Sequence, residues 1–167
     1  DEEEDKAFSS NMACPKCGYS IPDLEPRLFT FNNPAGACSG CDGLGVKPYV
    51  DVLKVIHEPT ASLSEGAIRG WDISHKYHFH LLKCLSKEYD FSLEEPFEDF
   101  DKETKELILN GSKGKPVNFS WRTKRGRLVD RRFPFEGILN NINRRYKETE
   151  SNYIREDLSK QISLSDC

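Results

Sequence analysis

Two matched cysteine pairs constrain the fold of this chain more than any other feature. Cys14 and Cys17 form the first pair, Cys38 and Cys41 form the second, and twenty residues separate the pairs. Two residues between cysteines allow a tight turn to direct both thiolates at one ion, and two such pairs are the usual ligands of tetrahedral zinc. Four thiolates leave no coordination position for a water. The sequence therefore predicts a structural Zn²⁺ rather than a catalytic one.

The residues around the pairs favour metal binding over redox chemistry. A redox Cys-x-x-Cys pair opens a helix in a thioredoxin-like fold. Here a proline and glycines surround the pairs, at Pro15, Gly18, Gly40 and Gly43, which is typical of metal-binding knuckles. An iron centre has compatible spacing and stays open as the alternative metal, with zinc preferred.

Length and composition favour a polar protein with small hydrophobic cores. The 167 residues are 37% hydrophobic and 31% charged, which fits one medium domain or two small ones. We find no apolar run long enough for a bilayer and no signal peptide, so we expect a cytoplasmic protein without a membrane partner. The other cysteines, Cys84 and Cys167, are scattered, which argues against a disulfide framework. Cys84 is expected to be a core residue of a helix.

The net charge of −4 conceals a strong asymmetry. Residues 1–5 are all acidic, and residues 88–106 carry nine carboxylates against two lysines. In residues 113–147 eleven lysines and arginines oppose only Asp130 and Glu136. A basic segment of this density can bind nucleic acid, and the acidic pI of the whole chain would conceal it.

The basic residues of that segment are candidate DNA contacts, because each phosphate that a cation contacts releases counterions. They are Lys113, Lys115, Arg122, Lys124, Arg125, Arg127, Arg131, Arg132, Arg144, Arg145 and Lys147. The alternative is that they pair with the acidic residues 88–106 inside the same module. The residues alone give the two interpretations comparable weight.

Turn residues and short apolar runs predict a small β-rich module around the cysteines. After an acidic tail at residues 1–7, residues 8–13 and 27–31 read as short strands, and prolines and Asn-Asn-Pro mark turns between them. This layout over residues 8–50 is similar to a zinc ribbon. A core this small needs its ion, so we expect metal binding and folding to be coupled.

The chain from residue 51 is predicted to form helices and one hairpin. Residues 75–89 read as a helix capped by Ser74, and residues 101–110 as a helix capped by Asp101 and ended by Gly111. Further helices are predicted at residues 135–147 and 153–162, the last with an apolar stripe. The first helix is expected to bury one face, made of Tyr77, Leu81, Leu82, Leu85 and Tyr89.

Alternating residues 117–121, a turn at 123–126 and residues 127–133 predict a β-hairpin with basic flanks. Phe119, Trp121 and Phe133 are interleaved with its basic residues. They could stack on exposed bases, but their strand spacing favours the core of the hairpin.

Catalytic signatures are absent from the sequence. The segment 111–115 has the composition of a phosphate-binding loop without its spacing, and no nucleophile–base pair stands out. The histidines His75, His78 and His80 are expected to be ordinary, partly exposed helix residues. We therefore expect no enzymatic activity from this chain alone.

Several long motifs resemble UvrA, the damage-recognition subunit of bacterial nucleotide excision repair, in the same order. They are CPKCGYSIP at residues 14–22, EPRLFTFNNPAGAC at 25–38, CDGLG at 41–45, GAIRGW at 66–71, PFEGIL at 134–139 and RRYKETES at 144–151. The resemblance runs through most of the chain but covers only a middle portion of UvrA.

The resemblance implies an α+β fold in which a zinc-ribbon-like module precedes helices packed on a short antiparallel hairpin. The four paired cysteines would be zinc ligands of the signature region, residues 51–150 an insertion domain beside the DNA-binding groove, and residues 151–167 a truncated helix that returns to the signature region. ATP would be bound only by other parts of the parent protein, and the UvrB-binding domain would lie upstream.

The resemblance favours a non-catalytic, DNA-binding part of an excinuclease subunit that helps to recognise damaged DNA. Its partners would be duplex DNA, other UvrA domains and, in the parent complex, UvrB. The alternative is a protein-interaction scaffold that docks on other UvrA domains or on UvrB.

Overall fold

The computed structural model describes residues 14, 16–17, 25–122 and 126–167. It divides into two compact units, Asp1–Lys47 with Ser165–Cys167, and Pro48–Leu164. The predicted strand at residues 8–13 and the hairpin turn at 123–125 lie outside the described residues.

The first unit has little regular structure among its described residues. The strand predicted at residues 27–31 is wrong, because the short 3₁₀ helix η1 occupies Pro26–Phe29. Pro26 supplies the φ of a first helical residue, and the Leu28 N–H donates to the Glu25 carbonyl over 2.9 Å. The local turn satisfies these backbone groups without a partner strand.

Strands β1 (Val46–Val50) and β4 (Ile162–Asp166) pair with each other. At one end the Cys167 N–H donates to the Gly45 carbonyl, and at the other the Asp51 N–H donates to the Gln161 carbonyl, each over 2.9 Å. The strands are therefore antiparallel. This sheet was not predicted, since its strands are more than 110 residues apart in sequence.

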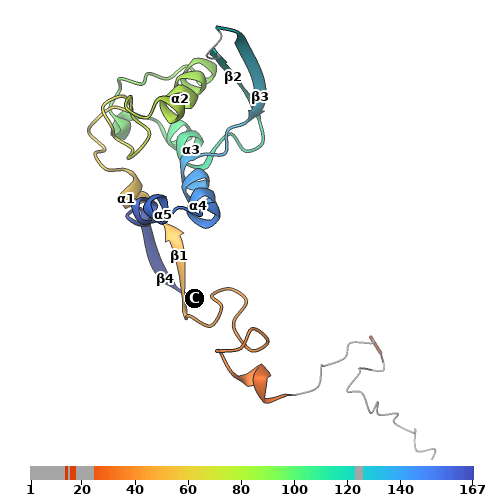
Figure 1. The fold of residues 1–167 in the computed structure, drawn as a ribbon. Helices are drawn as coiled ribbons and strands as arrows, with labels where there is room; N and C mark the ends of the chain where they lie inside the picture. Colours follow the sequence, from red (N-terminus) through yellow and green to blue (C-terminus); the bar gives the residue numbers. More distant parts are fainter. Residues whose placement is uncertain (1–13, 15, 18–24, 123–125) are drawn as a thin grey trace, which may run out of the picture. The chain divides into compact units, whose positions relative to one another are not determined.

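The second unit consists of helices with one hairpin along their side (Figure 1). The α-helices are α1 (Val52–Val55), α2 (Lys76–Tyr89), α3 (Lys102–Asn110), α4 (Ile138–Glu148) and α5 (Asn152–Ser159). A short 3₁₀ helix, η2, covers Phe97–Asp99. The mixed helix and hairpin composition confirms the predicted α+β class.

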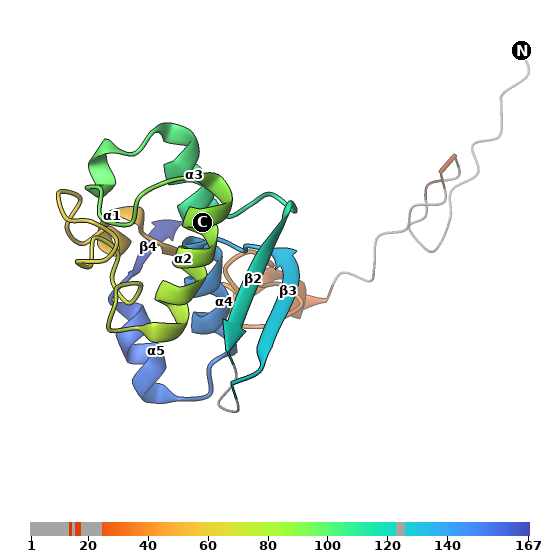
Figure 2. The ribbon, with the colours of Figure 1, turned by 90° about the horizontal axis from the view of Figure 1, so that it is seen from above.

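The hairpin pairs β2 (Pro116–Arg122) with β3 (Leu128–Pro134), as predicted. Figure 2 shows β2 alongside α2, with β3 on the outer side of the hairpin. The register places Val117 opposite Phe133 and Phe119 opposite Arg131. Directly opposed residues share one face of a sheet. Val117 and Phe119 are fully buried, so this face is the one that packs on the helices.

The predicted apolar face of α2 is only partly correct. Leu82 and Leu85 are buried, whereas Tyr77 is 69% and Tyr89 38% exposed, and Phe79 enters the core instead. A strict i, i+4 series drifts by about 40° per step around a helix with 3.6 residues per turn. The two ends of the series therefore leave the buried face. Ser74 does not cap this helix, because the N-cap residue is His75 and makes no side-chain cap bond.

Helix α3 follows its prediction at both ends. The Asp101 carboxylate accepts a hydrogen bond from the Thr104 N–H over 2.8 Å, and Gly111 ends the helix with φ 93°. Gly111 and Gly137 allow the chain segments around them to approach closely. A Cβ at Gly111 would overlap the Phe135 carbonyl, and one at Gly137 would overlap the Asn110 backbone.

The last two helices are shorter than predicted. Helix α4 begins at Ile138 rather than residue 135, because Gly137 has φ 87° and is its N-cap. Helix α5 ends at Ser159 rather than residue 162, and Ile162 belongs to β4. Backbone pairing with β1 replaces the last helical turn.

One hydrophobic core holds the second unit together. Its fully buried large side chains include Trp71, Phe119, Leu82, Leu85, Ile108, Ile138 and Ile142. Cys84 is 8% exposed in this cluster, which confirms its predicted core position. Among the described residues no helix has the length and apolar character to cross a bilayer.

Candidate metal centre and nucleic-acid interface

Three cysteine sulfurs lie together in the first unit. The Sγ atoms of Cys38, Cys41 and Cys167 are all within 4.8 Å of one another. Ligands of one tetrahedral zinc ion have sulfurs about 3.8 Å apart, given Zn–S bonds of about 2.3 Å. The three thiols therefore fit the ligand geometry of a metal ion with few adjustments.

The backbone around Cys38 and Cys41 has the form of a metal-binding knuckle. The Asp42 N–H donates to the Cys38 carbonyl over 2.8 Å, which closes the turn. The Gly45 N–H donates to Cys41 Sγ over 3.3 Å. The N–H of Gly40, followed by the Cys167 thiol, lowers the pKa of the Cys38 thiol to about 7. Such donors stabilise a thiolate, which is the form that binds a metal.

Cys14 and Cys17 are not members of this group of three sulfurs. The N–H of Cys17, followed by that of Lys16, lowers the pKa of the Cys14 thiol. The predicted set Cys14, Cys17, Cys38 and Cys41 stays a prediction. Cys167 was not among the predicted ligands, because its sequence position, 126 residues after Cys41, gave no spacing signal.

The described arginines of the hairpin are exposed. Arg127, Arg131 and Arg132 form no ion pair with any described residue. The register separates two of them: Arg131 is opposite Phe119 on the packed face, and Arg132 is opposite Asn118 on the other face. Of the other predicted contacts, Lys124 and Arg125 lie outside the described residues, as does the side chain of Arg122.

The basic residues of α4 differ from one another in their pairing. The Arg144 guanidinium donates to both carboxylate oxygens of Glu136, over 2.9 and 3.1 Å, and to Glu148 over 3.1 Å. Arg145 is half-buried and Lys147 exposed, and neither has an ion-pair partner within the described part of the chain. Arg144 therefore has two carboxylate partners, whereas Arg145 and Lys147 have none among the described residues, and all three stay predicted DNA contacts.

The acidic and basic segments make a single ion pair with each other among the described residues, between Lys113 and Glu106 over 3.6 Å. Lys115 is exposed on the same loop. Internal neutralisation, the alternative interpretation of the basic residues, is therefore limited to one exposed contact. Such a contact contributes little to stability.

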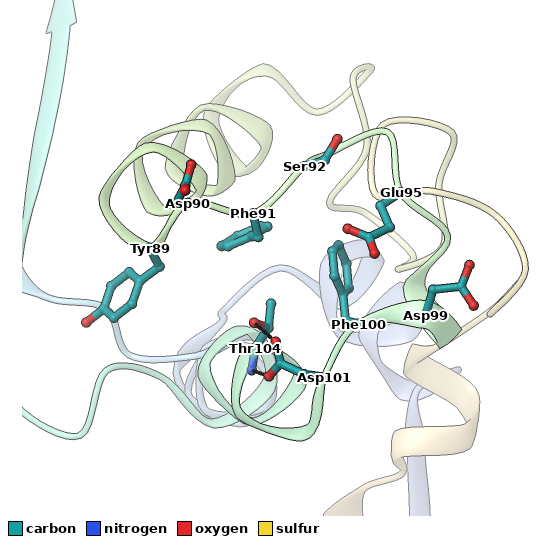
Figure 3. Close-up of a pocket in the computed structure, with 9 residues that line it drawn as sticks. All are labelled: Tyr89, Asp90, Phe91, Ser92, Glu95, Asp99, Phe100, Asp101 and Thr104. Atoms are coloured by element: carbon teal, nitrogen blue, oxygen red, sulfur yellow. Dashed lines mark hydrogen bonds between the residues drawn. The ribbon is translucent and has the colours of Figure 1, made fainter.

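The acidic segment lines a hollow of its own. Figure 3 shows four carboxylates, Asp90, Glu95, Asp99 and Asp101, around the rings of Phe91 and Phe100. These rings meet edge to face at 5.6 Å. The Asp101 carboxylate accepts hydrogen bonds from the N–H and the hydroxyl of Thr104, and these bonds lower the pKa of its carboxyl. The hollow is acidic at its rim and aromatic within.

The histidines have structural contacts, as expected. The His78 ring stacks on Trp71 with centroids 4.5 Å apart, and its Nδ1 hydrogen-bonds the Gly70 carbonyl over 3.0 Å. Burial lowers the pKa of His78. His80 Nε2 donates to the Ser120 carbonyl over 2.6 Å and so fastens α2 to β2.

A comparison with known protein families finds a match over most of the second unit. The family model described as the UvrA DNA-binding domain matches residues 51–160. This range contains the hairpin, α4 and the acidic hollow.

Curated relatives match nearly the whole chain. UvrABC system protein A of Pasteurella multocida is 52% identical over 166 residues, which are 99% of this chain and 18% of that protein. UvrABC system protein A of Haemophilus influenzae is 52% identical over 98% of the chain and 17% of that protein. The chain thus spans less than a fifth of the length of these relatives.

A solved structure shares the fold. The crystal structure of UvrA2 from Deinococcus radiodurans is similar over 94% of this chain and 20% of that one, with a TM-score of 0.62 and 18% sequence identity. At that identity the similarity establishes the fold alone.

Proposed function

This chain belongs to the UvrA family, and we propose from that premise that it is a non-catalytic DNA-binding part of a UvrA protein. In this role it contributes to the recognition of damaged DNA in nucleotide excision repair. ATP is bound and hydrolysed by other parts of the parent protein, and UvrB is a partner of the parent complex.

The observation that carries this proposal is the set of unpaired cations within the matched range. Arg127, Arg131 and Arg132 on the hairpin are exposed and have no ion-pair partner among the described residues. Buried charge pairs would have indicated internal neutralisation. Exposed, unpaired arginines can instead replace counterions along a phosphate backbone.

Contacts of this kind recognise the backbone and shape of DNA rather than its sequence. Phosphate contacts position a protein without reading bases, and sequence-dependent deformability contributes to selection. A damage-recognition protein meets lesions in every sequence context, so backbone contacts suit this task.

We also propose that the first unit binds one structural Zn²⁺ through thiolates that include Cys38 and Cys41. Cys14 and Cys17 complete the ligand set predicted from sequence, and the position of Cys167 makes it a competing donor. When bound, the ion would hold together a segment with few core residues of its own.

Salt-dependent binding of the complete chain to duplex DNA tests the main proposal. We expect weak binding at low salt, and weaker binding after Arg125→Glu, Arg131→Glu and Arg132→Glu are combined. Each lost phosphate contact should reduce the slope of log K against log salt by about one. Lys160→Glu is the control, because Lys160 pairs with Asp157 on another surface element, α5.

Undiminished binding by the triple variant, or none by the wild type at low salt, would contradict the proposal. Anisotropy of a labelled duplex provides the measurement.

The acidic hollow favours a second candidate function, a scaffold that docks a basic segment of another UvrA domain or of UvrB. Glu95 lines this hollow, and Glu94 accepts a hydrogen bond from Ser64 over 2.6 Å beside it. Charge reversal at Glu94, Glu95 and Glu98 should abolish retention of partner domains in a DNA-free pull-down. Unchanged retention would count against the scaffold.

A further inference from the structure

A second hollow lies within the matched DNA-binding range and differs in character from the acidic one. It has a volume of about 530 Å³ and lies between the first half of α2, the end of β3 and one side of α4. A volume in this range suits a small planar group. Its polar lining residues are His78, Glu136, Asn141, Arg144 and Arg145, and its aromatic ones Trp71, Tyr77, Phe133 and Phe135.

Aromatic side chains are present at two depths in this hollow. Trp71 and Phe135 are 2% and 3% exposed and meet edge to face at 6.1 Å, so they form a fixed floor. Tyr77 is 69% and Phe133 37% exposed at the rim. Phe133 is held in place by stacking on Phe119, with centroids 4.3 Å apart. The rings of Tyr77 and Phe133 therefore present flat, partly exposed aromatic surface at the rim.

The floor also contains an unsatisfied acceptor. Asn141 is 5% exposed, and its Nδ2 donates to Glu136 Oε1 over 2.6 Å. Its Oδ1 has no hydrogen-bond partner among the described residues. Buried polar atoms are rarely left unpaired, and each one costs free energy. Asn141 lines the hollow, so this buried polar group lies beneath the space that a ligand would fill.

The hollow has an uncharged interior and, among the described residues, an unpaired arginine at its edge. This arrangement favours a ligand with a neutral group inside the hollow and an anionic backbone outside it. The Arg144 charge is balanced by Glu136 and Glu148. Arg145 lacks an ion-pair partner within the described residues, and Arg131 shares with Phe133 the packed face of the hairpin. Burial keeps the pKa of His78 low, so its ring is uncharged at neutral pH.

We propose that this hollow receives one unstacked nucleobase of a distorted duplex, while Arg145 and Arg131 contact the adjacent phosphates. Aromatic side chains stack on any base, because every base has a flat π face. Extruding a base costs least where pairing is already disturbed. The hollow would thus favour damaged over intact duplex, an inference that rests on the proposed DNA binding.

Two duplexes of one sequence test this site with the complete chain. One is fully paired, and the other carries a single extrahelical adenine. The wild type should bind the second about tenfold more tightly, because stacking of one base is worth about 1–3 kcal/mol. Tyr77→Ala should remove this preference, and Tyr77→Phe should retain it, since only the ring is needed.

Tyr153→Ala is the matched control. Tyr153 is an exposed tyrosine on α5 outside the hollow, 81% exposed, and its replacement should leave the tenfold ratio intact. As a second readout, 2-aminopurine at the extrahelical position should lose fluorescence on binding the wild type and keep it with Tyr77→Ala. Circular dichroism checks that each variant is folded.

The outcomes separate the two proposals. Equal affinity of the wild type for both duplexes, or an unchanged ratio in Tyr77→Ala, would overturn the base-binding hollow and leave DNA binding intact. Absence of binding to either duplex at low salt would overturn the proposed function and this inference together.

Discussion

The sulfur atoms of Cys38 and Cys167 lie 3.6 Å apart, although 129 positions separate the two residues. Cys41 completes the group of three sulfurs. The arrangement depends on the pairing of β1 with β4, which brings Cys167 to the Gly45 carbonyl. A metal held here would therefore join the segment before β1, which carries Cys38 and Cys41, to Cys167 after β4.

Bound zinc should depend on the knuckle cysteines. Cys38→Ser and Cys41→Ser each remove a thiolate ligand and should reduce bound zinc from about one ion per chain to near zero, because serine is a poor zinc ligand. Elemental analysis of the folded protein measures this. Cys84→Ser is the control, since Cys84 belongs to the core of the second unit. Full zinc content in both knuckle variants would refute the proposed centre.

Cys14→Ser and Cys167→Ser distinguish the possible ligand sets. The set predicted from sequence requires Cys14, so Cys14→Ser should lose zinc while Cys167→Ser retains it. The opposite result would replace Cys14 by Cys167 as a ligand. Loss in both would mean that both parts of the chain contribute thiolates.

Gly137 should tolerate alanine far less well than Gly114. Both have positive φ, 87° and 82°, so each alanine pays a conformational cost of about 1–2 kcal/mol. A Cβ at Gly114 meets nothing within 4 Å, whereas at Gly137 it would overlap the backbone at Asn110 and Gly111. Gly137→Ala should therefore lose about 1–3 kcal/mol more in free energy of unfolding. Urea denaturation measures both, and equal losses would contradict the close approach.

Stability should fall as the pH drops below neutrality, in part through His78. Burial lowers the pKa of His78 in the folded state, so the unfolded chain takes up a proton at a higher pH than the folded chain does. The stabilisation is complete above the ordinary histidine pKa, about 6.5, and is lost as the pH falls towards the folded value. Urea denaturation at several pH values should show a shallower decline in His78→Phe, and an unchanged decline would contradict this.

Glu136→Gln should destabilise the start of α4. The Glu136 carboxylate accepts from Arg144 and Asn141, and the Arg144 bonds are the main cause of its lowered pKa. Its side chain is 39% exposed, so solvent screening limits the expected loss to about 1 kcal/mol. Glu148→Gln removes one exposed i, i+4 pair and should change stability by less than about 0.5 kcal/mol. Thermal unfolding compares them, and equal effects would refute a special role of Glu136.

Local signals predicted several elements correctly. Asp101 and Gly111 bound α3 as expected, and alternation from Val117 to Trp121 gave the hairpin. Capping, turns and strand alternation involve residues a few positions apart, so the sequence contains the whole signal. The α+β class and the family membership likewise followed from motifs that are contiguous in sequence.

Errors arose where a local turn or a distant partner strand overrode the predicted strand or helix. Residues 27–31 satisfy strand propensity but form η1, and α5 gives way to β4 because Ile162 and its neighbours pair with β1. Tyr77, assigned to the buried face of α2, is exposed at a hollow that no sequence pattern indicated.

The amino-acid order by itself determined that this chain carries paired thiols, a dense run of cations and the helices and hairpin that hold them. Only the tertiary structure decided that Cys167 joins Cys38 and Cys41, that Arg144 pairs with Glu136 whereas Arg132 has no ion-pair partner among the described residues, and that Asn141 lines one hollow with several aromatic residues. The physical reason is the distance along the chain over which each kind of signal acts. Spacing and periodicity encode neighbours along the backbone, while thiol groups, ion pairs and hollows form between side chains that only packing brings together.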